Sequence, residues 1–149
     1  MTVSIRCARQ SDVSLIAAFN VAMALETEGE HLAPATVHAG VKAALESASL
    51  GRYFVAETAE EVTACLMITY EWSDWRNGLM WWIQSVYVTP AYRQQGIFKR
   101  MYEHVRKTAS DANAAGLRLY VERENHRAQN TYKALGMTET HYRLYEDLF

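Results

Sequence analysis

One stretch constrains the possible folds of this chain more than any other: a strand-like run that is followed, within a dozen residues, by a helical pattern. Residues 84–101 read QSVYVTPAYRQQGIFKRM, and the β-branched and aromatic run Val86, Tyr87 and Val88 predicts a buried strand. Pro90 ends that strand because it has no N–H to donate. Apolar residues then recur at intervals of three and four, which predicts a helix through Phe98, Met101, Tyr102, Val105, Ala109 and Ala112.

The loop between this strand and this helix has the features of an anion site. It contains Arg93, Gln94, Gln95 and Gly96, and glycine lets the backbone turn sharply or approach a ligand closely. The first amides of a helix have no partner within the helix, and the helix dipole favours an anion beside them. The pattern predicts a site for a phosphate-bearing cofactor, although an ordinary strand–turn–helix connection would show a similar pattern.

Composition narrows the class of protein. The chain has 149 residues, half of them hydrophobic and 21% charged, which predicts a single folded domain over residues 1–149. A net charge of −2 without a long basic run argues against a nucleic-acid partner. The N-terminus lacks a long apolar run, so we expect no signal peptide, no membrane span and a cytoplasmic location. Cys7 and Cys65 are expected to be reduced core residues, and no metal-ligand spacing is present.

Periodicity and turn residues predict the other elements before the central stretch. We expect a strand at residues 3–8, a helix capped by Ser11 and running toward Ala24, a loop at 26–31 and a helix at 35–48. Residues 53–58 and 62–70 predict a hairpin. A loop at 71–78 ends in Asn77-Gly78, a strong hairpin signal, and leads to a strand at 79–89. The polar pair Gln84 and Ser85 inside that apolar strand predicts a bulge or a split in the sheet.

After the central helix, the pattern predicts a further strand, a helix and a final strand. Leu117, Leu119 and Val121 alternate as a strand, a helix at 127–135 is closed by Gly136, and residues 137–148 form a final hairpin strand. The fold class is therefore α+β, or mixed α/β, with one parallel strand–helix–strand crossover between residues 86 and 121.

A second motif lies near the C-terminus. Asn125, Ala128, Tyr132 and Gly136 take the spacing N-x-x-A-x-x-x-Y-x-x-x-G, and Ala128 and Tyr132 lie one turn apart on a helix. Any one of the chain's nine tyrosines can simply pack in a core. Two motifs in this order, at this separation, carry more weight than either alone.

Together the two motifs resemble those of the GNAT superfamily of acetyl-coenzyme A-dependent N-acetyltransferases. The family's pyrophosphate loop, Q/R-x-x-G-x-G/A, is matched by Arg93 and Gly96, and the resemblance covers nearly the whole chain. Residues 71–78, followed by S-V-Y-V and P-x-Y-R, also look like the diamine and polyamine branch. The resemblance implies a mostly antiparallel central sheet with one parallel β-α-β crossover, split near the fourth strand, with helices on both faces. It also implies acetyl-CoA as cofactor.

The sequence departs from the family pattern at Phe98, where relatives usually place glycine or alanine. A side chain facing the pyrophosphate would block the site. Phe98 is in phase with Met101, Tyr102 and Val105, so we expect it to point inward while its backbone amide stays near the phosphate.

The resemblance implies roles for particular residues. Tyr132 would be the general acid that protonates the leaving thiolate, and Asn125 would orient cofactor or loop backbone. Cofactor-binding residues would be Val86, Tyr87, Val88, Arg93, Gln94, Gln95, Gly96, Ile97, Phe98, Lys99 and Asn125. Candidates for substrate binding are Glu26, Glu28, Trp75 and Gln84, and no metal is expected.

The base that makes the acceptor amine neutral is less well defined. Polyamine-acetylating relatives often carry acidic residues where this chain has Gln84 and Ser85. Glu57, Asp74 and Glu122 are further candidates beside the two glutamates at 26 and 28, and ordered water could equally remove the proton. The tryptophans around the hairpin could receive a cationic amine or could pack in a core or a dimer interface.

The expected function is acetyl transfer from acetyl-CoA to the primary amine of a small molecule, by direct attack in a ternary complex. The acceptor would be amino acid-like, a diamine or a polyamine. The alternatives are a non-catalytic acyl-CoA-binding sensor or regulatory module, and a protein N-terminal or lysine acetyltransferase. A homodimer is expected from the apolar final strand and the tryptophan-rich hairpin, although a monomer also fits.

Overall fold

The computed structural model describes residues 2–149, which form two compact units. The first unit extends to Leu119 and the second comprises Tyr120–Phe149. The first contains the sheet and three α-helices, and the second contains one helix and the C-terminal tail. Each unit is described by itself.

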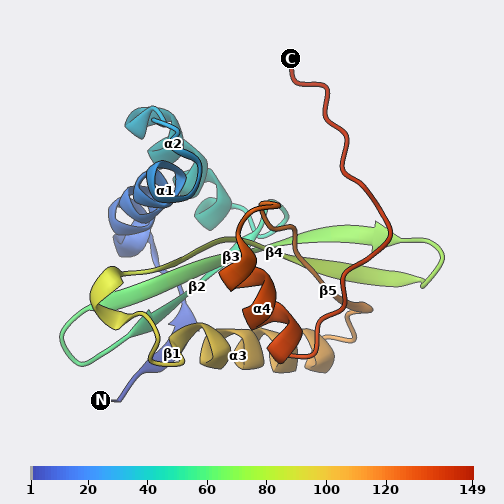
Figure 1. The fold of residues 1–149 in the computed structure, drawn as a ribbon. Helices are drawn as coiled ribbons and strands as arrows, with labels where there is room; N and C mark the ends of the chain where they lie inside the picture. Colours follow the sequence, from blue (N-terminus) through green and yellow to red (C-terminus); the bar gives the residue numbers. More distant parts are fainter. Residues whose placement is uncertain (1) are drawn as a thin grey trace. The chain divides into compact units, whose positions relative to one another are not determined.

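A five-stranded mixed sheet forms the centre of the first unit (Figure 1). Its strands, in spatial order, are β1 (Ser4–Cys7), β2 (Arg52–Glu57), β3 (Val62–Ser73), β4 (Gly78–Val88) and β5 (Gly116–Arg118). The first four pair antiparallel, and β4 pairs with β5 in parallel. This confirms the predicted mixed sheet with one parallel crossover.

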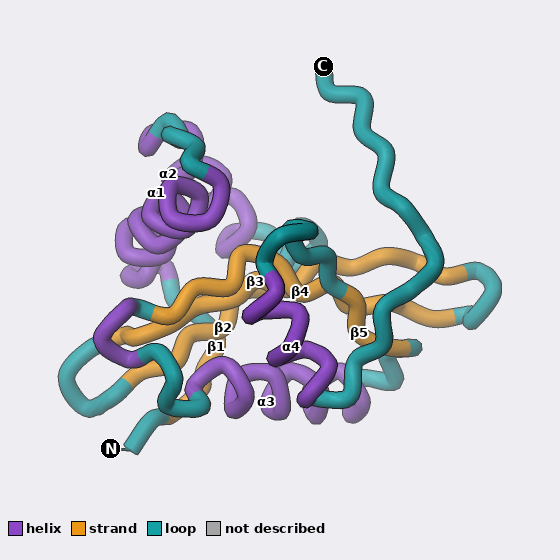
Figure 2. Tube along the Cα trace, in the orientation of Figure 1, coloured by secondary structure: helices purple, strands orange, loops and turns teal. Residues whose placement is uncertain are grey.

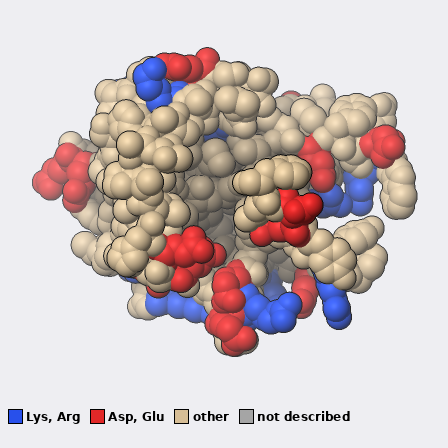
Figure 3. All heavy atoms as spheres, turned by 90° about the horizontal axis from the view of Figure 1, so that it is seen from above, with Lys and Arg blue, Asp and Glu red and all other residues tan. Residues whose placement is uncertain are grey.

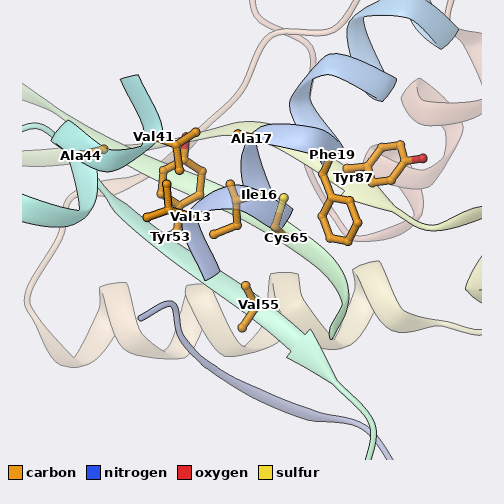
Figure 4. Close-up of a cluster of buried hydrophobic side chains, with 10 residues drawn as sticks. All are labelled: Val13, Ile16, Ala17, Phe19, Val41, Ala44, Tyr53, Val55, Cys65 and Tyr87. Atoms are coloured by element: carbon orange, nitrogen blue, oxygen red, sulfur yellow. The ribbon is translucent and has the colours of Figure 1, made fainter. Parts of the chain in front are cut away.

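Helices cover both faces of this sheet, as predicted. Helices α1 (Val13–Glu28) and α2 (Pro34–Glu46) lie on one face, and α3 (Ile97–Asp111) lies on the other (Figures 1 and 2). On the first face, α1 and α2 pack over buried side chains of β2, β3 and β4, among them Tyr53, Cys65 and Tyr87 (Figure 4). On the second face, α3 buries Met101 and Val105 completely. The core therefore fixes the strand that leads into α3 from both sides.

Cys65 lies in the middle of β3 and is fully buried. Burial raises the pKa of its thiol to about 12, because a thiolate would have no water around it there. The other cysteine, Cys7, is exposed, contrary to the prediction of a core residue, and neither forms a disulfide. Cys7 is the last residue of β1, which lies at the edge of the sheet, so its side chain remains exposed to solvent.

The predicted irregularity in the central strand is a bulge. Across β3 and β4, Cys65 is opposite Tyr87 and Met67 is opposite Gln84, so two residues of β4 lie opposite one residue of β3. Ser85, one of the two, has φ of +52°, a backbone conformation that non-glycine residues rarely adopt. A bulge turns backbone groups away from the ladder and thereby exposes them to a ligand.

The hairpin between β3 and β4 is longer than predicted. Strand β3 extends to Ser73 and β4 begins at Gly78, so only residues 74–77 form the turn, with Asn77 at φ of +49°. Trp81 is buried in the core, whereas Trp72 and Trp75 are exposed near the turn. The four tryptophans therefore do not form one wall.

Helix α1 also extends further than predicted. It continues to Glu28 and closes at Gly29, whose φ of +66° provides the left-handed residue that commonly ends helices. The Thr27 hydroxyl donates to the Met23 carbonyl within the last turn. Glu26 and Glu28 therefore lie on a helix rather than in the loop that the sequence suggested, which fixes the direction of their side chains.

The second unit contains α4 (His126–Ala134), close to the predicted helix. The Asn125 side chain caps it by accepting from the Ala128 amide at 3.2 Å, and Gly136 follows with φ of +93°. The predicted strand through Leu117 is present as β5 but ends at Arg118, and the predicted final strand at 137–148 is wrong: in residues 2–149, no strand follows Arg118. Charged residues interrupt the apolar alternation of the tail, and a strand also needs a neighbour to accept its hydrogen bonds. Its large apolar side chains are exposed: Tyr142, Leu144, Tyr145, Leu148 and Phe149.

Candidate functional site

The N-terminus of α3 has the geometry of an anion site. Gly96 occupies the N-cap position with φ of +76°, and no side chain caps the helix. The Arg100 amide donates to the Gly96 carbonyl at 3.1 Å, so the amides of residues 97–99 precede the first helical hydrogen bond. Helix α3 has 15 residues, and its dipole therefore favours negative charge at this end.

The backbone around Gly96 leaves room for a ligand. A Cβ atom built on Gly96 would have nothing within 4 Å, so glycine is required there by its φ angle and not by crowding. Gln94 also has a positive φ, of +61°, and the Gln95 side chain donates through Nε2 to the Ala91 carbonyl at 3.0 Å. These features hold the loop in a turn whose amides can surround a phosphate group.

Arg93 links this loop to the end of α1. Its Nη2 lies 2.7 Å from Oε2 of Glu26, and its Nε donates to the Val88 carbonyl at 2.8 Å. The guanidinium lies over the Tyr87 ring, 5.4 Å from its centroid, and the Tyr87 hydroxyl donates to Oε1 of Glu26 at 3.2 Å. Burial raises the pKa of Tyr87, with the Glu26 charge acting in the same direction, so its phenol stays protonated at neutral pH. The structure thus brings together Glu26, Tyr87 and Arg93, which were predicted separately.

Gln84 has a partner that the sequence did not reveal. Its side-chain Nε2 donates to the hydroxyl of Thr69 on β3. The amide is therefore oriented, and its oxygen remains an acceptor for an ammonium group. Thr69 could have been found only from the strand register, which depends on the bulge at Ser85 and on the length of the hairpin.

Phe98 lies differently from the prediction. Ile97, not Phe98, is the buried residue at the start of α3, with 2% of its surface exposed. Phe98 is half-buried, and its ring centroid lies 6.3 Å from that of Tyr102. Ile97 lies four residues before Met101 and eight before Val105, so it shares the buried face of the helix with them.

The predicted substrate residue Trp75 lies far from the bulge along the hairpin. It is in the turn before Gly78 and is 87% exposed, whereas Gln84 is six residues further along β4. At about 3.3 Å per residue, the two are separated by roughly 20 Å. The structure therefore does not place Trp75 beside Gln84.

The remaining cofactor candidates flank the loop on both sides. Val86 and Val88 are partly buried at the end of β4, and Lys99 is exposed in the first turn of α3. The Lys99 ammonium lies 3.9 Å from Glu103, a contact too long and too exposed to hold it firmly. Lys99 is thus available to an anion at this helix end.

Tyr132 and Asn125 both belong to the second unit. Tyr132 lies on α4, and burial raises the pKa of its phenol above the ordinary value of 10. Asn125 accepts the Ala128 amide as the cap of that helix. In this structure Asn125 therefore has a local structural contact as the cap of α4.

The other carboxylates considered as bases have contacts of their own. Glu57 lies 3.0 Å from the Arg6 guanidinium, Asp74 accepts the Trp75 amide at 2.9 Å, and Glu122 accepts the Glu124 amide at 2.7 Å. Of these carboxylates, Glu26 is the one that forms an ion pair with a residue of the anion loop, Arg93.

Neither a metal-binding group nor a membrane-spanning helix is present in residues 2–149. Within that range, no group of three or more His, Cys, Asp or Glu side chains is placed to hold a metal ion. In the same range, no helix has both the length and the apolar character needed to cross a membrane.

Comparison with known proteins identifies the family. The model of the acetyltransferase (GNAT) family matches residues 18–137. A bovine (Bos taurus) protein, thialysine N-epsilon-acetyltransferase, is 39% identical over 67 residues, which are 45% of this chain and 39% of that protein. The chain thus matches about two fifths of the length of this curated relative.

Solved structures agree with this match. A possible acetyltransferase from Clostridium difficile 630 is 45% identical, with a TM-score of 0.93, over 100% of this chain and 99% of that one. A predicted acetyltransferase with acetyl-CoA from Clostridium acetobutylicum shares the fold, with a TM-score of 0.80 at 19% identity, over 98% and 96% of the two chains.

These matches confirm the fold and the family that the two sequence motifs indicated. The acetyl donor of the family is acetyl-CoA, and the uncapped, glycine-led start of α3 fits its pyrophosphate. The matched region includes β4, the anion loop, α3 and α4. The chain belongs to the acetyltransferase (GNAT) family.

Proposed function

We propose that this chain transfers acetyl from acetyl-CoA to the primary amine of a small molecule, by direct attack in a ternary complex. The acceptor is amino acid-like, a diamine or a polyamine. One observation carries the proposal: the β4 bulge, the anion loop and the N-terminus of α3 follow one another within residues 84–99 of one folded unit.

The cofactor's binding groups are supplied by the loop and by the strand end. Amides of residues 95–99 and the cations Arg93 and Lys99 hold the pyrophosphate at the N-terminus of α3. The backbone of Val86 and Val88 pairs with the pantetheine arm as an added strand would. Bound acetyl-CoA supplies an activated acetyl thioester.

The bulge provides the group that polarises the acetyl carbonyl. In a regular strand the backbone amides near Ser85 would donate to β3. At the bulge, however, Ser85 and Val86 of β4 lie opposite a single residue of β3. An amide turned out of the ladder can donate to a developing oxyanion. We assign this role to the amide of Ser85 or Val86.

The acceptor amine needs an anion and a route for its proton. An alkylamine with a pKa of about 10.4 is almost entirely protonated at neutral pH, so it must lose a proton before attack. Glu26 supplies the carboxylate that attracts the ammonium, and the oxygen of Gln84 accepts a hydrogen bond from it. Glu28, on the same last turn of α1, adds negative charge at this end of the helix.

Tyr132 is the general acid of the proposal. Its phenol, with a raised pKa, is fully protonated at neutral pH and can donate to the departing thiolate. Asn125 holds the start of α4 and thereby positions the turn that precedes Tyr132.

The similarity to the bovine protein supports an acceptor of the amino acid or diamine class. That protein's name specifies acetylation at the N-epsilon amine of thialysine, and 39% of the 67 matched residues are identical. On the face drawn in Figure 3, Lys and Arg residues are interspersed with Asp and Glu residues, a surface suited to small polar acceptors rather than to a polyanion.

An amine panel tests the proposed function. Release of free CoA thiol from acetyl-CoA is measured with lysine, thialysine, linear diamines, polyamines and an N-terminal peptide. We expect turnover with one of the small amines. Turnover only with the peptide would instead identify a protein acetyltransferase.

One observation favours a second function, a non-catalytic acyl-CoA-binding module. Gln84 occupies the position where polyamine-acetylating relatives often carry an acid, and an amide cannot act as a base. Calorimetric binding of CoA without turnover on any amine of the panel would support this alternative.

We also propose a homodimer and a cytoplasmic location. The exposed apolar tail, which includes Leu144, Leu148 and Phe149, supports a partner surface in the dimer. Light scattering at micromolar concentration tests the dimer. A monomer mass for the full chain would contradict the dimer, and a dimer that persists after removal of residues 142–149 would exclude the tail as its interface.

A further inference from the structure

Glu26 and Arg93 form an ion pair, although the proposed function assigns Glu26 to the acceptor amine and Arg93 to the cofactor. In this structure the Glu26 carboxylate is held from both sides, by Arg93 at 2.7 Å and by the Tyr87 hydroxyl at 3.2 Å. The Arg93 guanidinium in turn lies over the Tyr87 ring and donates to the Val88 carbonyl at 2.8 Å. The three side chains form a closed cluster, which we call the Glu26 cluster.

Two anions compete for the Arg93 guanidinium: the Glu26 carboxylate and the pyrophosphate proposed at the start of α3. Arg93 lies three residues before Gly96, in the loop that surrounds the phosphate site, and its side chain is directed toward α1 by Glu26. A pyrophosphate group at the start of α3 carries more negative charge than one carboxylate, so it competes for the guanidinium.

The ion pair is weak enough to exchange. The Arg93 and Glu26 side chains are 39% and 40% exposed, and pairs with this exposure change an equilibrium by about fivefold or less. The contact to Val88 runs through Nε, and this contact can persist while Nη2 changes partner. The cluster is therefore stable without a ligand and is easily opened by one.

We propose that the Glu26 cluster is a latch that couples the two substrates: cofactor pyrophosphate draws Arg93 away from Glu26, and the released carboxylate binds the acceptor ammonium. This inference rests on the proposed function, because it requires a CoA phosphate at α3 and a cationic acceptor at Glu26. Before the cofactor binds, Arg93 neutralises Glu26 and the acceptor site is weak. The cofactor therefore binds first, and each substrate strengthens binding of the other by the same factor.

The decisive measurement is CoA binding without any amine, by titration calorimetry at low salt. Glu26→Gln removes the competitor for Arg93, so we expect it to bind CoA about three- to fivefold more tightly than the wild type. Glu30→Gln removes the same charge from the loop after α1, and it is expected to stay within twofold of the wild type. A thermal melt of each variant checks that the fold is intact.

A double-variant cycle separates the latch from a general charge effect. In an Arg93→Gln background, Glu26→Gln should no longer alter CoA affinity, because the residue for which it competes is absent. The wild type should also bind 1,5-diaminopentane more tightly when saturated with CoA, and Glu26→Gln should lose that enhancement.

The outcomes distinguish the latch from the function on which it rests. If the wild type binds CoA but Glu26→Gln binds it equally or more weakly, Glu26 positions Arg93 rather than competing for it, and the latch is overturned alone. An unchanged Glu26→Gln effect in the Arg93→Gln background would also overturn it. Failure of the wild type to bind CoA would overturn both proposals.

Discussion

The Arg6 guanidinium and the Asp12 carboxylate form a two-point contact between β1 and the start of α1. Nη1 lies 2.8 Å from Oδ2, and Nη2 lies 3.2 Å from Oδ1. The Arg9 amide also donates to Oδ2 at 2.7 Å, so one carboxylate joins the strand, the connecting turn and the helix. The hydrogen bond from Arg6 lowers the pKa of Asp12, and the Arg9 amide acts in the same direction against the cost of burial.

Replacement of Asp12 should destabilise the protein. Asp12→Asn leaves the Arg6 charge with a poorer partner, and we expect the free energy of unfolding to fall by about 1–3 kcal/mol in urea titrations. Asp111→Asn is the matched control: Asp111 pairs with Lys107 on the exposed side of α3, and its loss should cost less than about 0.5 kcal/mol. Equal effects of the two variants would contradict the structural role of Asp12.

The same pair predicts a dependence of stability on acid. Because the folded pKa of Asp12 lies below its unfolded value, its contribution is fully present above the unfolded value of about 3.9. The contribution is lost as pH falls through the lower, folded pKa. Unfolding experiments between pH 6 and pH 2 should show a shallower acid dependence for Asp12→Asn than for the wild type.

The bulge should respond oppositely to two substitutions at Ser85. Glycine adopts φ of +52° freely, so Ser85→Gly should leave stability unchanged or raise it by up to about 1 kcal/mol. Ser85→Val puts a β-branched residue in that conformation and should lower stability by about 1–3 kcal/mol. Chemical denaturation measures both variants, and an equal loss in each would show that the Ser85 side chain matters instead of its backbone.

Gly96 and Gly40 form a matched pair for testing the anion loop. A Cβ at either meets nothing within 4 Å, but only Gly96 has a positive φ. Gly96→Ala should cost about 1–2 kcal/mol of stability and weaken CoA binding several-fold. Gly40→Ala, inside α2, should raise the melting temperature, since alanine favours the helix by about 0.5–1 kcal/mol. Calorimetry with CoA provides the comparison, and unchanged affinity in Gly96→Ala would argue against the loop as the phosphate site.

Removal of the Tyr132 hydroxyl should slow acetyl transfer. Tyr132→Phe is expected to lower kcat by about 10²–10⁴-fold, the usual contribution of a general acid, with little change in CoA affinity. A general acid acts only while protonated, so the wild-type rate should fall as pH rises through a pKa above 10. Absence of that alkaline decline in the wild type, or an unchanged kcat in the variant, would remove Tyr132 from the proposal.

A carboxylate at residue 84 should improve the reaction with diamines. Gln84→Glu places a base where the Gln84 amide now donates to Thr69, and the Thr69 hydroxyl can reverse its role and donate to the carboxylate. We expect kcat/KM for diamines to rise about tenfold. An unchanged value, measured in a variant that melts like the wild type, would place the amine away from residue 84.

The order of the elements in the first unit could be predicted because the periodic patterns there match local structure. The buried run at Val86–Val88, the amphipathic pattern of α3 and the Asn77-Gly78 turn each satisfy one local rule. The bulge followed from a polar pair within an apolar strand. These features depend on neighbours in the sequence, which is why sequence patterns alone could locate them.

Long-range contacts and the C-terminal tail could not be predicted in the same way. The pair between Glu26 and Arg93 spans 67 residues, and it depends on α1 continuing one turn past its apolar pattern. The bond between Gln84 and Thr69 depends on the register across a bulge. The tail was predicted as a strand from its strand-like pattern, but a strand requires a pairing partner, which local sequence does not specify.

Because Cys65 is buried, the reactivity of its thiol reports local opening of the sheet around it. A thiol reagent reacts with thiolate, and a fully buried thiol with a pKa of about 12 presents almost none at pH 8. Exposed Cys7 should be labelled at once, whereas Cys65 should be labelled only when the sheet opens beside the bulge. The slow phase of labelling therefore measures the stability of the β3–β4 contact in the native state, and CoA should slow it further if the cofactor binds along β4.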